Sequence, residues 1–121
     1  MAGNSNIPED TLKRLDAAVR RWIDTKAFLL PDPTPSDSAK RIGTTSALLH
    51  RYCLEVLGED FRTIRSRLRI REAQRLLVEQ PQLPLSTVGR QVGIKDRSNF
   101  LKQFKTVTGE NPADWRKKFQ K

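Results

Sequence analysis

Ala39-Lys-Arg-Ile-Gly43 and Gly89-Arg-Gln-Val-Gly93 are two copies of one short pattern. The first copy is followed after fourteen residues by Gly58, and the second after fifteen by Gly109. Each copy predicts a short helix, a tight turn at its last glycine and a second amphipathic helix that ends at the following glycine. This is the outline of a helix-turn-helix, which in DNA-binding proteins places its second helix in the major groove. The chain therefore contains two predicted helix-turn-helix motifs.

The repeat extends beyond these glycines. Gly58-Glu59 matches Gly109-Glu110, and Ile64-Arg65 matches Trp115-Arg116 if the two turns differ in length by one residue. Chance rarely produces agreement over such a length, so the two motifs are interpreted as copies of one unit.

The second copy also resembles a known family. Three segments carry the resemblance, namely 88–94 (Val-Gly-Arg-Gln-Val-Gly-Ile), 98–105 (Ser-Asn-Phe-Leu-Lys-Gln-Phe-Lys) and 109–116 (Gly-Glu-Asn-Pro-Ala-Asp-Trp-Arg). They look like the signature of AraC-type transcription regulators, and residues 69–77 are similar to the middle helix of that family. The resemblance covers residues 11–116 and implies a DNA-binding module that regulates transcription.

In that family the module usually follows a sensing or dimerising domain. The stretch Phe28-Leu-Leu-Pro-Asp32 resembles regulators in which a sensory part precedes the first lobe. The resemblance therefore implies the output module of a longer regulator, with a stand-alone regulator as the alternative.

The basic charge lies in the part of the chain that contains the repeats. The formal net charge is +9; residues 1–35 hold five Lys or Arg against five acids, and residues 36–121 hold eighteen against nine. Because Lys and Arg bind phosphates with release of counterions, this excess fits double-stranded DNA as the partner. A merely solvated basic surface has the same composition, so the motifs decide between the two interpretations.

Several other classes of function are disfavoured. Cys53 is the only cysteine, which excludes an internal disulfide and a multi-cysteine zinc site and favours a reducing, cytoplasmic setting. We expect neither a metal nor a cofactor, and no apolar run approaches the ~20 residues of a membrane span. Paired carboxylates near a nucleophile and phosphate-binding glycine loops are also missing, so an enzyme is not expected and no catalytic residue is assigned.

Apolar spacing and capping residues predict the helices. Those of the first lobe are 11–26, 34–42 with Thr34 as cap, and 45–57 with Thr45 as cap and Val56 among the inward residues. Those of the second lobe are 85–92, 97–108 with Asp96 as cap, and 112–119. A central helix capped by Asp60 joins the lobes. About twenty residues at ~1.5 Å each make it ~30 Å long, close to the ~34 Å of one DNA turn.

The exposed polar residues near the start of each second helix are the candidates for base contact. They are Ser46, Ala47, His50 and Arg51 in the first copy and Arg97, Ser98, Asn99 and Lys102 in the second. Arg and Lys suit guanine, Asn suits adenine, and an alanine methyl can contact thymine. The alternative interpretation makes all eight ordinary solvated residues; the family resemblance favours contact.

The repeat also suggests roles for certain arginines and for two small residues of the first lobe. Arg65 and Arg116 match across the repeat and are predicted phosphate contacts, whereas the other arginines of the central helix are expected to be solvated or structural. Cys53 aligns with Phe104, and Ser38 with Val88. We therefore expect a buried, unreactive thiol and a loosely packed first lobe, which Ser38→Leu and Cys53→Phe together would stabilise.

Together these observations predict an all-α fold of about seven helices. A flexible stretch at 1–10 precedes a tandem domain at 11–121, with the first lobe at about 11–58, a linker helix at about 60–79 and the second lobe at about 84–119. The predicted function is sequence-specific binding of double-stranded DNA in transcription regulation. RNA polymerase and a sensory or dimerisation domain outside this chain are possible further partners. The alternative is a helical interaction module that contacts RNA polymerase or another protein without reading bases.

Overall fold

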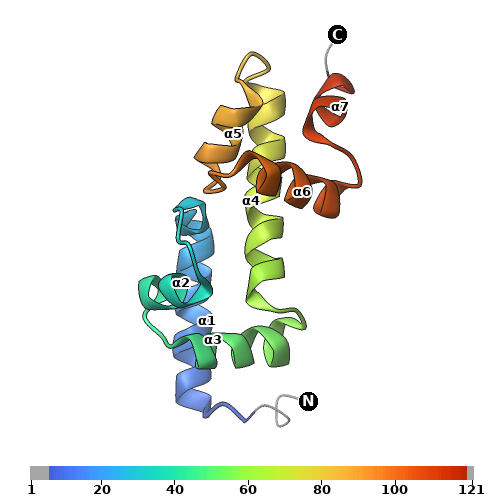
Figure 1. Cartoon of the computed structure of the whole chain (residues 1–121). Coiled ribbons are helices and arrows are strands. Elements are labelled where there is room, and N and C mark those ends of the chain that lie inside the picture. Colours follow the sequence, from blue (N-terminus) through green and yellow to red (C-terminus); the bar gives the residue numbers. More distant parts are fainter. Residues whose placement is uncertain (1–5, 120–121) are drawn as a thin grey trace. The chain divides into compact units, whose positions relative to one another are not determined.

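The structure is a computed structural model that describes residues 6–119, and this part is helical without a β-strand (Figure 1). Seven α-helices occur in it, as the sequence predicts. In chain order the elements are α1 (Glu9–Asp24), the 3-10 turn η2 (Ala27–Leu29), α2 (Pro35–Ile42), α3 (Ser46–Tyr52), the π-helical turn η3 (Cys53–Leu57), α4 (Phe61–Glu79), α5 (Leu85–Gln91), α6 (Arg97–Thr108) and α7 (Pro112–Lys117).

The helices form two compact units. Unit 1 comprises residues 6–27 and 32–64 of the described part, and unit 2 comprises residues 28–31 and 65–119. The first turn of α4 thus belongs to unit 1 and the rest of this helix to unit 2. The short segment Phe28–Pro31, which precedes α2 in the sequence, packs as a part of unit 2.

Unit 1 is built on the apolar face of α1. Leu15, Val19 and Trp22 are buried at helical spacing, and the Trp22 and Phe61 rings lie 5.3 Å apart. α1 begins at Glu9, two residues before the expected start, and Ile7 ahead of it is 5% exposed. The helix thus includes Glu9 and Asp10 of the stretch expected to be flexible, whereas residues 1–5 lie outside the described part.

The turn of the first motif follows the local chemistry of its sequence. Thr34 and Asp37 form a reciprocal capping box at the start of α2, and Pro35 occupies the first helical position. Gly43 ends α2 with a φ of +99°, in the left-handed region that favours glycine. Thr45 Oγ1 then accepts a hydrogen bond from the Leu48 amide and starts α3. The predicted caps and the turn are all confirmed.

The end of α3 differs from the prediction. The helix expected to run to Leu57 changes at Cys53 into the π-helical turn η3. Because this turn has i→i+5 spacing, the inward face of α3 is not continued, and Val56 is 42% exposed instead of buried. Leu54 and Leu57 are also exposed there.

Unit 2 has an apolar core of its own. Ile70, Ala73 and Leu77 of α4 are almost completely buried, and so are the two phenylalanines of α6, Phe100 and Phe104. The Phe104 ring contacts Phe100 and also Trp115 of α7, in edge-to-face arrangements of 6.0 and 5.9 Å. The remaining buried members of the cluster are Leu76, Val88, Val92 and Ile94. α7 ends at Lys117, two residues earlier than expected.

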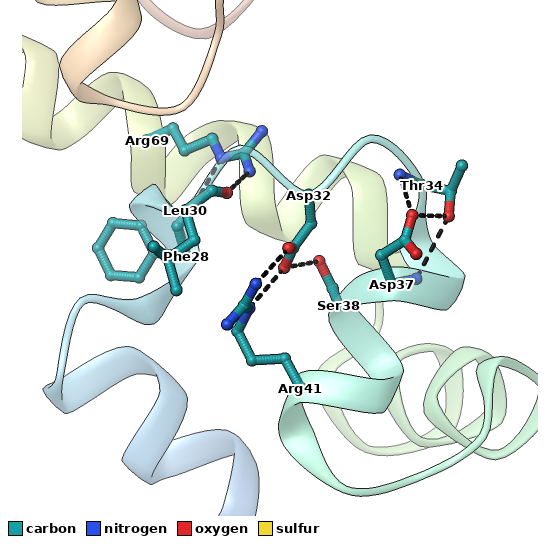
Figure 2. A network of polar contacts seen from close by, with 8 residues as sticks. All are labelled: Phe28, Leu30, Asp32, Thr34, Asp37, Ser38, Arg41 and Arg69. Atoms are coloured by element: carbon teal, nitrogen blue, oxygen red, sulfur yellow. Dashed lines mark hydrogen bonds and ion pairs between the residues drawn. The ribbon is translucent and has the colours of Figure 1, made fainter.

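Within unit 1, Ser38 belongs to a buried polar cluster (Figure 2). The Ser38 hydroxyl donates to Asp32 Oδ2 at 3.2 Å, and the Arg41 guanidinium donates to both oxygens of Asp32 at 2.8 and 3.0 Å. Ser38 and Asp32 are 0% and 9% exposed. Ser38 therefore provides a hydrogen bond to a buried carboxylate, and the expectation that it leaves an apolar gap is wrong.

Within unit 2, Arg69 holds the segment Phe28–Pro31 (Figure 2). Its guanidinium donates to the Phe28 carbonyl at 2.6 Å and to the Leu30 carbonyl at 2.7 Å, and the residue is only 5% exposed. The carbonyl of Leu29, between these two, points at Gly93: a Cβ added there would lie 2.6 Å from that oxygen. Arg69 and the Gly93 turn, which are themselves adjacent, thus both contact the same short segment.

Candidate nucleic-acid interface

The first candidate surface is the outer side of α3 in unit 1. The inward residues Leu49 and Tyr52 are buried, and the Tyr52 hydroxyl donates to Asp16 of α1, which fixes the rotation of α3 about its axis. Burial, followed by this hydrogen bond, raises the pKa of Tyr52. The four predicted contact residues, Ser46, Ala47, His50 and Arg51, are all exposed on the remaining surface of the helix.

An internal ion pair reduces the positive charge of this surface. Arg51 Nε lies 3.4 Å from Glu55 Oε2, and the other Glu55 oxygen accepts from the Asn6 amide at 2.9 Å. Glu55 is thereby held in place by the segment that precedes α1. A base contact by Arg51 requires this ion pair to open or to be shared.

The loop after η3 adds another acidic group near α3. Asp60 Oδ1 accepts a hydrogen bond from the Thr63 amide at 2.8 Å, which confirms it as the cap of α4. Hydrogen bonds from Thr63 hold the pKa of Asp60 below its usual value, and the positive potential of His50 adds to this. His50 and Asp60 also line the same small hollow of unit 1.

The second candidate surface is the outer side of α6 in unit 2. Gly93, with a φ of +85°, makes the turn after α5, and Asp96 accepts from the Asn99 amide at 2.8 Å to start α6. Phe100 and Phe104 fix the inward face of α6 in the core. The predicted contact residues of this copy, Arg97, Ser98, Asn99 and Lys102, are all exposed.

The two surfaces differ in charge. α6 carries three exposed cations, Arg97, Lys102 and Lys105, and no acid, whereas α3 carries Arg51 paired with Glu55 of the following turn. Arg90 and Lys95 flank the Gly93 turn and are exposed near Arg97 around one hollow. The sequence analysis did not single out these two; a count of cations across the turn would have found them. The structure thus concentrates positive charge on the second motif.

The two predicted phosphate contacts have different environments. Arg65 is 8% exposed, so little of its side chain is accessible to a phosphate in this conformation. Arg116 is partly exposed; its Nη2 makes a long 3.5 Å hydrogen bond to the Gln80 carbonyl, and its buried Nε has no hydrogen-bond partner. Burial weighs against Arg65 as a phosphate contact, whereas Arg116 keeps donor capacity.

The remaining arginines of α4 are consistent with structural or solvated roles. Arg69 binds backbone carbonyls, and Arg75 pairs with Glu72 and Glu79 of the same helix. Cys53 is 1% exposed, and burial together with the nearby Asp60 carboxylate raises the pKa of its thiol to about 11. A thiol of this kind is a poor nucleophile at neutral pH, as expected for a structural residue.

Comparison with known proteins agrees with this geometry. A family model described as a helix-turn-helix domain, of the AraC type, matches residues 38–118, which include both motifs. The chain belongs to the AraC-type helix-turn-helix family. The domain is therefore a DNA-binding domain of transcription regulators and not an enzyme.

Two similar proteins are regulators. The ornithine utilization regulator of Pseudomonas aeruginosa is 31% identical over 107 residues, which cover 88% of this chain and 30% of the regulator. The arabinose operon regulatory protein of Escherichia coli is 32% identical over 78 residues, 64% of this chain and 26% of that protein. The chain thus spans less than a third of the length of these relatives.

A solved structure supports the same assignment of fold. The C-terminal domain of AraT, a response regulator from Geobacillus stearothermophilus, is similar with a TM-score of 0.75 at 26% identity. The alignment covers 87% of this chain and 84% of the AraT domain. A protein from Listeria innocua has a TM-score of 0.76 at 25% identity, covering 86% and 96%. None of the helices in residues 6–119 is both long and apolar enough to cross a membrane.

Proposed function

We propose that both helix-turn-helix motifs of this AraC-type domain read base sequence, each through the exposed side of its second helix. The observation that carries the proposal is the exposure of all eight candidate residues on α3 and α6, opposite the buried anchors Leu49 and Phe100. Side chains in this position of a helix-turn-helix reach base edges in the major groove.

The two helices should contribute unequally. Lys102 has no acidic neighbour on α6, whereas Arg51 is paired with Glu55. An Arg or Lys that contacts guanine contributes about 1 to 3 kcal/mol of discrimination. We expect Lys102→Ala to fall in the upper part of this range and Arg51→Ala in the lower part, since Arg51 first has to give up its ion pair.

The test is a selection of preferred duplexes from random DNA, followed by affinity measurements on the preferred site. Each variant should relax base preference only at its own positions. Arg71→Ala, an exposed arginine on α4 outside both candidate surfaces, is the control for lost charge. Equal loss of affinity for every sequence, with no position relaxed, would favour the interaction-module alternative instead.

Glu55 offers a gain-of-binding variant. Glu55→Gln removes the carboxylate charge opposite Arg51 and keeps an oxygen that can accept from the Asn6 amide. We expect this variant to bind duplex DNA more tightly, by a factor that shrinks as salt increases. Unchanged affinity would show that Arg51 and its surroundings do not face DNA.

We further propose that the domain acts as the output part of a longer cytoplasmic regulator. Its match to less than a third of two regulators supports this, because the rest of those proteins is available for sensing or dimerisation. Contact with RNA polymerase belongs to the same proposal. Crosslinking of the promoter-bound domain to RNA polymerase tests that contact, and DNA binding without any crosslink would remove it.

A further inference from the structure

Unit 2 contains a hollow between α5 and α6 with an apolar floor. Its volume is about 320 Å³, at the lower end of the range for small-molecule sites. Ile94 and Phe100 form the floor and are 6% and 2% exposed; the half-buried side chains of Leu85 and Leu101 form its walls. Residues held in this way by the core provide a preformed apolar surface.

Three cations surround this floor. Arg90 comes from α5, Lys95 from the turn and Arg97 from the first position of α6, and all three are exposed. The lining includes no acidic residue, and none of the three forms an ion pair within the described part of unit 2. An apolar floor whose charged lining residues are all cations matches a ligand that combines an apolar body with an anionic group.

The first repeat provides an internal comparison. A hollow at the corresponding place in unit 1 is lined by Pro35, Ser46, Leu49 and His50 and has a volume of about 180 Å³. Its lining also includes one cation, Arg62, and one acid, Asp60, whose carboxylate disfavours an anion. The larger volume and the lack of an acid in the lining are therefore particular to the second motif rather than general features of a helix-turn-helix.

We propose that the hollow of unit 2 binds a small amphipathic carboxylate. The apolar body lies on Ile94 and Phe100, and the carboxylate lies among Arg90, Lys95 and Arg97. Arg97 is also a proposed base contact, so an occupied hollow competes with duplex DNA. That competition rests on the proposed function, whereas binding of the carboxylate does not.

The experiment is a titration of the DNA-free protein with octanoate, followed by NMR of the amides and of the methyl groups of Leu85, Ile94 and Leu101. Octanol, which has the same chain without the charge, and acetate, which has the charge without the chain, are the ligand controls. Inorganic phosphate tests whether the rim only binds phosphate. We expect saturable shifts around the hollow with octanoate and much weaker shifts with the other three.

A matched pair of variants tests the rim. Lys95→Glu reverses a charge of the hollow, and Lys105→Glu makes the same change on an exposed residue of α6 that does not line it. We expect the octanoate Kd to rise at least about threefold for Lys95→Glu and to change less than about twofold for Lys105→Glu. Both lysines are exposed, so neither variant threatens folding.

Several outcomes would overturn the proposal. They are the absence of saturable shifts at the hollow, equal shifts with octanol or phosphate, equal effects of the two variants, and equal binding at the hollow of unit 1. In the octanoate titration these results are obtained without DNA. They therefore separate a failure of this proposal from a failure of base reading.

Discussion

Replacement of Gly93 by alanine should destabilise unit 2 more than the same change at Gly109. Both glycines end helices of unit 2 in the left-handed region, with φ of +85° and +86°. A Cβ at Gly109 would meet nothing within 4 Å, but at Gly93 it would lie 2.6 Å from the Leu29 carbonyl oxygen and 3.1 Å from Arg69 Cζ. The pair therefore separates backbone strain from the close approach of the Phe28–Pro31 segment.

The magnitude follows from these contacts. Left-handed alanine costs about 1 to 2 kcal/mol, partly offset by about 0.4 to 1 kcal/mol because alanine reduces the entropy of the unfolded chain. Gly109→Ala should therefore cost about 1 kcal/mol. At Gly93 the Leu29 carbonyl has to move away, which weakens the hydrogen bonds of Arg69 to Phe28 and Leu30. A lost hydrogen bond to a charged group costs about 1.5 to 3 kcal/mol, so Gly93→Ala should cost about 3 kcal/mol in total.

Urea unfolding measures this difference if each unit is observed separately. Trp22 belongs to unit 1 and Trp115 to unit 2, so Trp115 fluorescence in a Trp22→Phe background reports on unit 2 alone. With a urea dependence of about 1 to 3 kcal/mol/M, the two alanine variants should differ in midpoint by about 1 M. Equal midpoints would refute the close approach of Leu29 to the Gly93 turn.

Further predictions concern unit 1 and the overall affinity for DNA. Ser38→Leu should lower the free energy of unfolding by about 1 to 3 kcal/mol, because Asp32 loses a buried donor; Ser38→Ala, which removes the donor without adding bulk, is the comparison in thermal unfolding. Burial raises the pKa of Cys53 from 9.0 to about 11, which lowers the thiolate population at neutral pH about hundredfold. Iodoacetamide should therefore modify Cys53 at least about hundredfold more slowly in the folded protein than in the urea-unfolded protein. The same raised pKa stabilises the protein below about pH 9 and loses this contribution as the pH rises toward 11, a fall that Cys53→Ala should reduce. Duplex affinity should fall linearly with salt on logarithmic scales, corresponding to about six to ten phosphates, and a nearly flat slope would remove phosphates as its main source.

Local chemistry made much of the fold predictable. Thr34, Thr45 and Asp96 each accept a hydrogen bond from an amide three residues later, and a cap of this kind depends on neighbours in the sequence alone. The sequence predicts the start of α1 two residues too late, because the first apolar position of the helix is Leu12. Glu9 and Asp10 nevertheless suit the first turn of a helix. The π-helical turn at Cys53 was not predictable, since local propensities do not distinguish it from an α-helix.

The candidate surfaces were partly predictable for a different reason. The repeat places Arg51 and Lys102 at equivalent positions, and exposure of both agrees with the prediction, although base contact itself is untested. The partner of Arg51 was not foreseen. Arg69 looks in the sequence like any other arginine of the central helix, and only the packed structure shows that it binds carbonyls 39 and 41 residues earlier in the chain. Spacing along one helix carries no information about such distant partners.

The membership of Phe28–Pro31 in unit 2 has a consequence for the order of folding during synthesis. A ribosome makes this segment long before Arg69, and longer still before the Gly93 turn on which the segment also packs. Until those residues emerge, the Phe28 and Leu30 carbonyls of the nascent chain lack the Arg69 guanidinium as a hydrogen-bond donor. Residues 28–31 are thus synthesised early but reach their final packing only after residues of unit 2 have been synthesised. A fragment that begins at residue 65 would leave Arg69 without these two acceptors.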